Sequence, residues 1–265
     1  MRKAVLVAIL LMLLPAMAAE PPREDESEFY FTRLIYRNNG MRGYQDRASG
    51  DACGGGGWRT DLPDADEKYV WGIKRLTGLR VHSDPRNPVH SVGIMDPELF
   101  HHPFIYAVEP GAMDLNDEEA ARLREYLLRG GFWHLDDFWG GCQLDNVVDQ
   151  LHKVFPEQDL QDIPLNHDVF HTFFDVDHIA QIPNISNARR LFRGDPNAHT
   201  WEQPGDREPR ILGLYDDHRR LMVVVTYNSD LGDAWEWLDD PEYPASVTTL
   251  SYREGIDFIM YSMSH

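Results

Sequence analysis

Residues 117–154 read DEEAARLREYLLRGGFWHLDDFWGGCQLDNVVDQLHKV, and this stretch decides the fold class. Its first third, residues 117–129, carries apolar side chains at helical spacing and is followed by two glycines, which commonly end a helix. The apolar residues 132–135 predict a buried strand, and residues 144–154 return to helical spacing. This alternation of helix, strand and helix predicts an α/β domain with a mostly parallel central sheet.

The rest of the chain continues the alternation on both sides. Aromatic and β-branched runs predict further strands at residues 29–36, 104–108, 210–215 and 221–227. Residues 63–76 and 246–264 are predicted to be helices. No linker divides the chain, so we expect one domain from residue 29 to residue 265.

The first 28 residues are expected to precede this domain. A basic start, an apolar stretch from Ala4 to Leu14 and the small residues of Ala16-Met17-Ala18 are typical of a secretory signal peptide, which we place at residues 1–18. Residues 19–28 are expected to be a disordered, proline-containing acidic leader. We therefore expect an exported protein, periplasmic or extracellular, that associates with a membrane only if the signal segment stays uncleaved.

The charge and the missing motifs limit the function. The chain has 25 basic and 44 acidic residues, a formal net charge of -19. Such a surface repels phosphate, so we expect no nucleic acid as a partner. Two explanations of the charge stay open, namely solubility alone and a cation-binding surface. The chain lacks the Gly-x-Ser-x-Gly elbow of serine hydrolases and the glycine-rich fingerprints of nucleotide enzymes.

Three polar clusters follow predicted strands, at residues 54–61, 136–141 and 228–237. In a parallel sheet, ligands bind beyond the carboxyl ends of the strands, so we expect the clusters to converge on one cleft. Each cluster combines carboxylates, tryptophan and glycine, a mixture suited to a polar ligand. The candidate ligand-binding residues are Trp58, Asp61, His134, Trp139, Asp230, Asp233, Trp235 and Glu236, and the candidate catalytic residues are Asp136 and Asp137.

The clusters also have structural explanations. Asp136 or Asp137 would cap the next helix, and Asp233 and Glu236 would stabilise the start of another. As a functional site, the clusters are consistent with three classes of protein: one that binds a glycan-like small molecule, a hydrolase that uses the carboxylates with or without a divalent cation, and a partner of an envelope protein. Carboxylate oxygens within about 5 Å of one point would favour a metal site. Outward-facing tryptophans would favour a protein partner.

Two long motifs resemble a bacterial family. They are Leu123-x-x-Tyr126-Leu127-Leu128-x-Gly130-Gly131-Phe132 with the following Asp136-Asp137-Phe138-Trp139-Gly140, and Asn228-x-Asp230-Leu231-Gly232-Asp233-Ala234-Trp235-Glu236. The family they resemble is catalogued as domain of unknown function 4159. The resemblance implies a flavodoxin-like three-layer sandwich, similar to class I glutamine amidotransferases and trehalose-utilisation-protein-like folds.

The resemblance also has implications for Asp137 and for the two cysteines. In amidotransferases a helix, two glycines and a strand lead to a nucleophilic cysteine, and that place falls on or beside Asp137, which supplies no thiolate. The resemblance therefore implies the fold without glutaminase activity. The count of two cysteines leaves a disulfide and two free thiols equally open. Cys53 precedes the stretch around Trp58, which also resembles the family, and Cys142 follows the motif around Asp137. If the resemblance places both stretches in one cleft, Cys53 and Cys142 are expected to form a disulfide.

Overall fold

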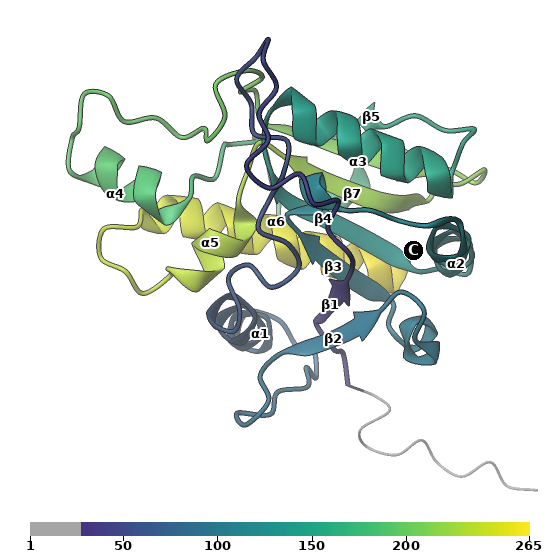
Figure 1. The fold of residues 1–265 in the computed structure, drawn as a ribbon. Helices are drawn as coiled ribbons and strands as arrows, with labels where there is room; N and C mark the ends of the chain where they lie inside the picture. Colours follow the sequence, from purple (N-terminus) through teal and green to yellow (C-terminus); the bar gives the residue numbers. More distant parts are fainter. Residues whose placement is uncertain (1–27) are drawn as a thin grey trace, which may run out of the picture.

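The computed structural model describes residues 28–265, whose arrangement is shown in Figure 1. The predicted signal peptide and the leader up to residue 27 lie outside the described residues. The described chain is an α/β structure with a seven-stranded sheet in the order β2-β1-β3-β4-β7-β6-β5. The strands are β1 (Thr32–Ile35), β2 (His90–Gly93), β3 (Phe104–Val108), β4 (Phe132–Phe138), β5 (Gln161–Asp162), β6 (Arg210–Tyr215) and β7 (Leu221–Tyr227).

The sheet is mostly parallel, as predicted. β2, β1, β3, β4 and β7 pair with one another in the parallel sense. β6 is antiparallel to β7, and β5 is antiparallel to β6. The carboxyl ends of the five parallel strands therefore lie along one edge of the sheet, and the amino ends lie along the opposite edge.

The strand predictions hold best where the apolar runs are long. β3, β6 and β7 have the predicted bounds, whereas β1 is shorter than predicted. β4 continues three residues beyond the prediction, because Asp136 still pairs with β3 and Phe138 with β7. β2 and β5 are not predicted from the sequence, since their sequences HSVG and QD contain no apolar run.

The described residues form six α-helices: α1 (Asp64–Leu76), α2 (Asp117–Leu128), α3 (Gly140–Val154), α4 (Ile185–Phe192), α5 (Leu231–Glu236) and α6 (Ala245–Ser264). Short 3-10 helices include η2 (Pro97–His101). α2 begins with a capping box in which Asn116 and Glu119 each accept a hydrogen bond from the other's backbone N–H. Among residues 28–265, no helix is both long and apolar enough to cross a membrane.

Helices cover both faces of the sheet (Figure 1). On one face, α1, α5 and α6 pack on a core that includes Phe31, Tyr106 and Val224. On the other face, α2 and α3 pack on a core that includes Trp133 and Val223. β3 and β7 are buried on both sides, which explains their continuous apolar sequences. Each fully buried valine or phenylalanine of these strands contributes about 1.5–3 kcal/mol.

A disulfide joins the long loop after β1 to the first turn of α3. Cys53 and Cys142 have Cα atoms 5.1 Å apart, within the range that a disulfide requires. The bond closes a loop with a sequence separation of 89 residues. In the chain-entropy model such a loop restricts the unfolded state enough to contribute about 4–5 kcal/mol. The disulfide thereby fixes the glycine-rich loop against the carboxyl edge of the sheet.

Candidate functional site

The turns at the carboxyl edge have an unusual backbone. Among the described residues, five that are not glycine have positive φ, and four of these lie at this edge: Asp61 (65°), Glu109 (54°), Asp137 (57°) and Asn228 (55°). Glu109 and Asn228 directly follow β3 and β7, and Asp137 lies near the end of β4. Positive φ costs a residue with a side chain about 1–3 kcal/mol and is concentrated at functional sites. The four turns therefore indicate a site here.

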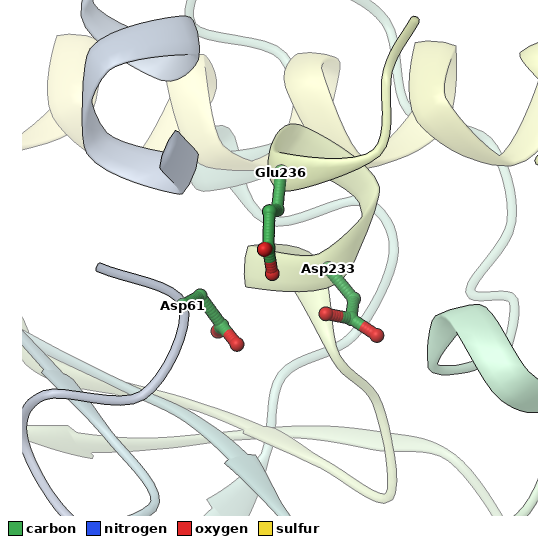
Figure 2. Close-up of side chains that lie close together, drawn as sticks. All are labelled: Asp61, Asp233 and Glu236. Carbon is green, nitrogen blue, oxygen red and sulfur yellow. The ribbon is translucent and has the colours of Figure 1, made fainter. Parts of the chain in front are cut away.

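Five carboxyl groups meet above these turns, and we call them the acidic centre: Asp61, Asp137, Asp230, Asp233 and Glu236. Asp61, Asp137 and Asp230 each place one carboxylate oxygen within 4.8 Å of the others, and so do Asp61, Asp233 and Glu236. Figure 2 shows Asp61 from the loop before α1 facing Asp233 and Glu236 from α5. Asp61 belongs to both groups. The acidic centre thus offers two overlapping sets of three oxygen ligands.

Hydrogen bonds hold several of these carboxylates in place. Asp137 Oδ1 accepts from Trp139 Nε1 at 2.9 Å. Asp230 caps α5, because its Oδ1 accepts from Asp233 N at 2.8 Å, and Asp233 Oδ2 accepts from Ile185 N at 2.6 Å. Asp61 Oδ2 differs: it is shielded from solvent and has no hydrogen-bond partner among the described residues. A buried oxygen without a donor is destabilising unless something else binds it.

Burial and mutual repulsion dominate the electrostatics of the acidic centre. Desolvation raises the pKa of Asp137 and Asp230 well above the ordinary value; the next cause is Glu109 for Asp137 and Asp137 for Asp230. The pKa of Asp61 is raised well above the ordinary value in the same way, by desolvation and then by Asp233. Desolvation likewise raises the pKa of Glu236 to about 7. At neutral pH these carboxyl groups therefore either retain protons or need a cation.

Arg33 is the positively charged side chain that acts on Asp61, but most of its hydrogen bonds go to other residues. The Arg33 guanidinium is fully buried and lowers the pKa of Asp61. Its Nε donates to Asp66 Oδ1 at 2.6 Å, and its Nη1 donates to the backbone oxygens of Trp58 and Thr60. Arg33 therefore fixes the start of α1 and neutralises only part of the charge of the acidic centre.

Glycines let the backbone approach these carboxylates. A Cβ added to Gly55 would lie 2.0 Å from Glu109 Oε2, and a Cβ added to Gly232 would lie 2.6 Å from Asp61 Oδ2. The glycine run of residues 54–57, which begins the first polar cluster, thus has a structural reason. The loop packs directly on the carboxylate of Glu109.

Several candidate residues lie outside the acidic centre. Trp235 is fully buried and stacks on Tyr69 with ring centroids 3.8 Å apart, so it belongs to the core. His134 is fully buried on the sheet, where its Nε2 lies 3.1 Å from Thr226 Oγ1, and burial lowers its pKa to about 3. Trp139 is also buried and positions Asp137. The expected cleft therefore does not have walls made of Trp139 and Trp235.

Asp136 and Trp58 also have other surroundings. Asp136 is fully buried and accepts hydrogen bonds from Tyr106 OH at 2.8 Å and from Thr226 Oγ1, and burial raises its pKa to about 6. It faces the core that contains Tyr106, whereas Asp137 turns towards the acidic centre. Trp58 is partly exposed, packs on the opposite core and carries the Arg59 guanidinium over its ring. Of the paired aspartates, only Asp137 belongs to the acidic centre.

Helix capping explains one of the two polar clusters, at residues 228–237, but not the cluster at residues 136–141. The N-cap of α3 is Trp139 and makes no side-chain cap hydrogen bond, so neither Asp136 nor Asp137 caps that helix. The cluster at residues 228–237 does start a helix, because Asp230 caps α5 and Asp233 lies in its first turn, whereas Glu236 is the last residue of α5 and the expectation for it is wrong. Asp230 and Asp233 therefore have a structural role as well as a place in the acidic centre.

Two further acidic residues act on the acidic centre and are not among the sequence candidates. Glu109 and Glu202 are the largest charged influences on the pKa of Asp137 after desolvation. Glu109 directly follows β3, so the rule that located the other clusters could also have found it. Glu202 lies in the loop between α4 and β6. In the sequence it is far from the end of any parallel strand, so no sequence signal indicates it. Burial raises its pKa to about 7.

The acidic centre does not line the most prominent cavity of the described residues. A cavity of about 670 Å³ lies between α1 and residues 83–88, and its lining contains none of the residues of the acidic centre. Its lining combines acidic residues with Lys68, Lys74 and Arg75. We therefore place the candidate site by its chemistry, at the carboxyl edge of the sheet.

The chain was compared with known protein families and with curated proteins, and one family matches most of the described fold. A search of the curated proteins finds no match. A family model matches residues 47–263, a range that includes every residue of the acidic centre. Because this match covers most of the chain, the protein belongs to the family described as Domain of unknown function (DUF4159).

Proposed function

We propose that this protein binds a divalent cation through Asp61, Asp137 and Asp230 and uses the cation to hold a polar ligand. The observation that carries the proposal is the convergence of these three carboxylates around the buried, unpartnered Asp61 Oδ2. Carboxylate oxygens are the preferred ligands of Ca²⁺ and Mg²⁺. Of the residues that would hold the cation, Asp61 lies in the loop between β1 and α1, Asp137 lies near the end of β4, and Asp230 lies between β7 and α5.

The electrostatics favour a cation over an anionic or purely neutral ligand. Within the acidic centre, charge repulsion from other carboxylates raises the pKa of Asp61, Asp137 and Asp230. A divalent cation would replace this repulsion by attraction and would satisfy Asp61 Oδ2. An anionic ligand would meet the same repulsion unless the cation were bound first.

The polar ligand that we expect is a glycan-like molecule, because hydroxyl groups can complete the coordination of a hard cation without adding negative charge. We also propose that the protein acts outside the cytoplasm, on the basis of the sequence of residues 1–18. Its negative charge remains the reason for expecting no nucleic acid partner.

We further propose that the fold is flavodoxin-like, related to that of class I glutamine amidotransferases. The order of the parallel strands supports this, because β2-β1-β3-β4-β7 corresponds to the order 2-1-3-4-5 of flavodoxin-like sheets. Ligands of such sheets bind where the order reverses, between the first and third strands, and Asp61 and Glu109 lie at that edge. Aspartate at residue 137 argues against glutaminase activity.

A hydrolase is the second candidate, and the backbone of Asp137 favours it. This residue lies on a turn with positive φ between a strand and a helix, where a reactive side chain is held rigidly. A bound cation would lower the pKa of a water molecule, and Asp137 would accept a proton from that water or ligate the cation. The amides at the start of α3 already donate to Gln143, Asn228 and Asp51, so they offer no free oxyanion hole.

The envelope-complex alternative has less support. It depends on outward-facing tryptophans as interface anchors, and both Trp139 and Trp235 are buried.

Isothermal titration calorimetry with Ca²⁺, Mg²⁺ and Mn²⁺ tests the proposal. Wild type should bind one of these cations, and Asp61→Asn should weaken binding at least tenfold, because this residue contributes to both sets of ligands. The matched control is Asp145→Asn, an exposed residue of α3, which should bind as wild type does. Glycans should then bind only in the presence of the cation.

Two results would count against the proposal. If none of the cations binds, or if Asp61→Asn binds as tightly as wild type does, the acidic centre is not a cation site. If the cation binds but soluble glycans give no heat with or without it, the cation site stands and the glycan-like ligand does not. Hydrolysis of a glycan with loss of activity in Asp137→Asn would select the hydrolase.

A further inference from the structure

A second cluster of titratable side chains lies at the opposite edge of the sheet. His90 is the first residue of β2, His102 lies two residues before β3, and Tyr30 lies two residues before β1. Because these three strands are parallel neighbours, their amino ends lie together. The cluster is thus separated from the acidic centre by the length of the strands, and it contains imidazoles where the acidic centre contains carboxylates.

The two imidazoles face one another through the same nitrogen. His90 Nε2 and His102 Nε2 are 3.1 Å apart, the ring centroids are 4.7 Å apart, and the ring planes are inclined at 64°. Rings aligned end to end at this nitrogen separation would have centroids about 5.4 Å apart, so at least one ring is tilted away from the line that a strong N–H···N hydrogen bond requires. Two nitrogens bound tetrahedrally to one zinc ion, each at about 2.0–2.1 Å, lie roughly 3.3–3.4 Å apart. The observed separation is close to that value.

The surroundings hold both rings in position. The Tyr30 ring packs against His82, His90 and His102 with centroid separations of 4.5, 4.8 and 5.9 Å. The backbone oxygen of His102 accepts a hydrogen bond from Tyr126 OH at 2.9 Å. A cavity of about 260 Å³ opens beside His102, and His90 is partly exposed to solvent. Two pre-positioned ligands and an entry path are what a metal site requires.

The charge state of the cluster suits a metal ion. Burial lowers the pKa of His90, and it lowers the pKa of His102 to about 4, so both imidazoles are neutral near pH 7. Neutral imidazole is the form that binds metals. The Glu98 carboxylate raises the pKa of both histidines, and its negative charge would also stabilise a bound cation. His82 and His101 are the other titratable groups that act on the pair, and both disfavour added protons.

We propose that His90 and His102 form a second cation site, which binds a borderline transition-metal ion such as Zn²⁺ or Cu²⁺ through their Nε2 atoms. Water fills the remaining positions of the ion. Imidazole ligands select these ions, whereas carboxylate oxygens select Ca²⁺ and Mg²⁺. The proposal therefore does not depend on the function of the acidic centre, and the two sites can be loaded separately.

The test uses the full chain without an affinity tag, in excess Ca²⁺ to occupy carboxylate sites. Zn²⁺ is titrated calorimetrically, and one equivalent of Cu²⁺ is added for electron paramagnetic resonance. Wild type should bind Zn²⁺, and the Cu²⁺ spectrum should show coupling to two imidazole nitrogens. His90→Gln and His102→Gln should each weaken Zn²⁺ binding at least tenfold. The matched control is His101→Gln, an exposed neighbour, which should leave the affinity unchanged.

Three results would overturn the proposal. They are an unchanged Zn²⁺ affinity in both His90→Gln and His102→Gln, an equal loss in His101→Gln, and a Cu²⁺ spectrum with coupling to fewer than two nitrogens. If circular dichroism shows that a variant does not fold, NMR of the wild-type imidazoles decides instead. One equivalent of Zn²⁺ must then shift the Nε2 signals of His90 and His102, and unshifted signals would refute the site.

Discussion

Replacing Asp137 by asparagine should raise thermal stability in the absence of a divalent cation and abolish the stability that the cation adds. Asparagine keeps the size of the side chain and tolerates the left-handed conformation of this residue, whose φ is 57°. Its amide oxygen can still accept the hydrogen bond from Trp139 Nε1. The substitution therefore removes a charge and retains the turn after β4.

The two expected effects have different origins. Without a cation, burial and the repulsion from Glu109 and Glu202 raise the pKa of Asp137, so wild type must either bury a charge or take up a proton at neutral pH, and both reduce its stability. Removing this carboxyl group should raise the free energy of unfolding by about 1–3 kcal/mol. With a cation at about 100 times its Kd, wild type should gain roughly 2.7 kcal/mol, or about 5–10 °C in Tm for a domain of this size. The variant should lose that gain.

Differential scanning calorimetry at pH 7.5 measures both effects, once with a chelator and once with excess Ca²⁺. The Tm of Asp137→Asn should lie above that of wild type in chelator, and Ca²⁺ should raise the Tm of wild type but not that of the variant. Asp145→Asn, on the exposed side of α3, should follow wild type in both conditions. A variant that melts below wild type in chelator and gains as much from Ca²⁺ as wild type does would show that the charge of Asp137 is neither repelled nor a ligand.

Three further predictions concern pH, the disulfide and one turn. Burial raises the pKa of Glu202 and Glu236 from 4.5 to about 7, so the stability they contribute is complete below the unfolded value and is lost as the pH rises. In chelator, Tm should therefore fall between pH 4.5 and pH 7, and Ca²⁺ should flatten the fall; a Tm that rises over this interval would contradict the assignment. Replacing Cys53 and Cys142 by serine should lower the free energy of unfolding in urea by about 4–5 kcal/mol, and no loss would show that the bond does not form. Asn228→Ala should cost about 2–4 kcal/mol in the same assay, because it removes three side-chain hydrogen bonds and strains a positive φ; Asn228→Gly should recover only the backbone part.

The sequence predicts the carboxylates of the site because they follow a topological rule. In a parallel sheet the residues after successive strands meet at one edge, so Asp137 and Asp230 could be placed together without coordinates. The same rule misplaces Trp235. This residue is two positions after Asp233 on a helix, where a rotation of about 200° turns it to the other side, and composition alone does not indicate which side faces the core.

Short elements such as β2 and α4 could not be predicted from sequence patterns, for a physical reason. β2 is a four-residue edge strand whose formation depends on pairing with β1, and α4 has only eight residues. Short elements obtain their stability from tertiary contacts and not from their own propensity. Glu202 and the His90–His102 pair could not be predicted from the sequence for the same reason. Only the packing of segments far apart in sequence brings these side chains to their neighbours.

The two overlapping sets of ligands in the acidic centre are not equivalent. Glu236 lies near Lys68, whose charge lowers the pKa of that carboxyl group and thus neutralises part of the set that contains Asp233. Asp137 and Asp230 are almost fully buried, at 5% and 3% exposure, and the largest charged influences on their pKa values are other carboxylates. No cationic side chain is among the main influences on the pKa of Asp137 or Asp230, whereas Arg33 lowers the pKa of Asp61, so a cation bound beside Asp137 and Asp230 relieves the most unfavourable charge. For this reason Glu236→Gln should weaken cation binding less than Asp137→Asn does, and the reverse order would move the cation to the other set.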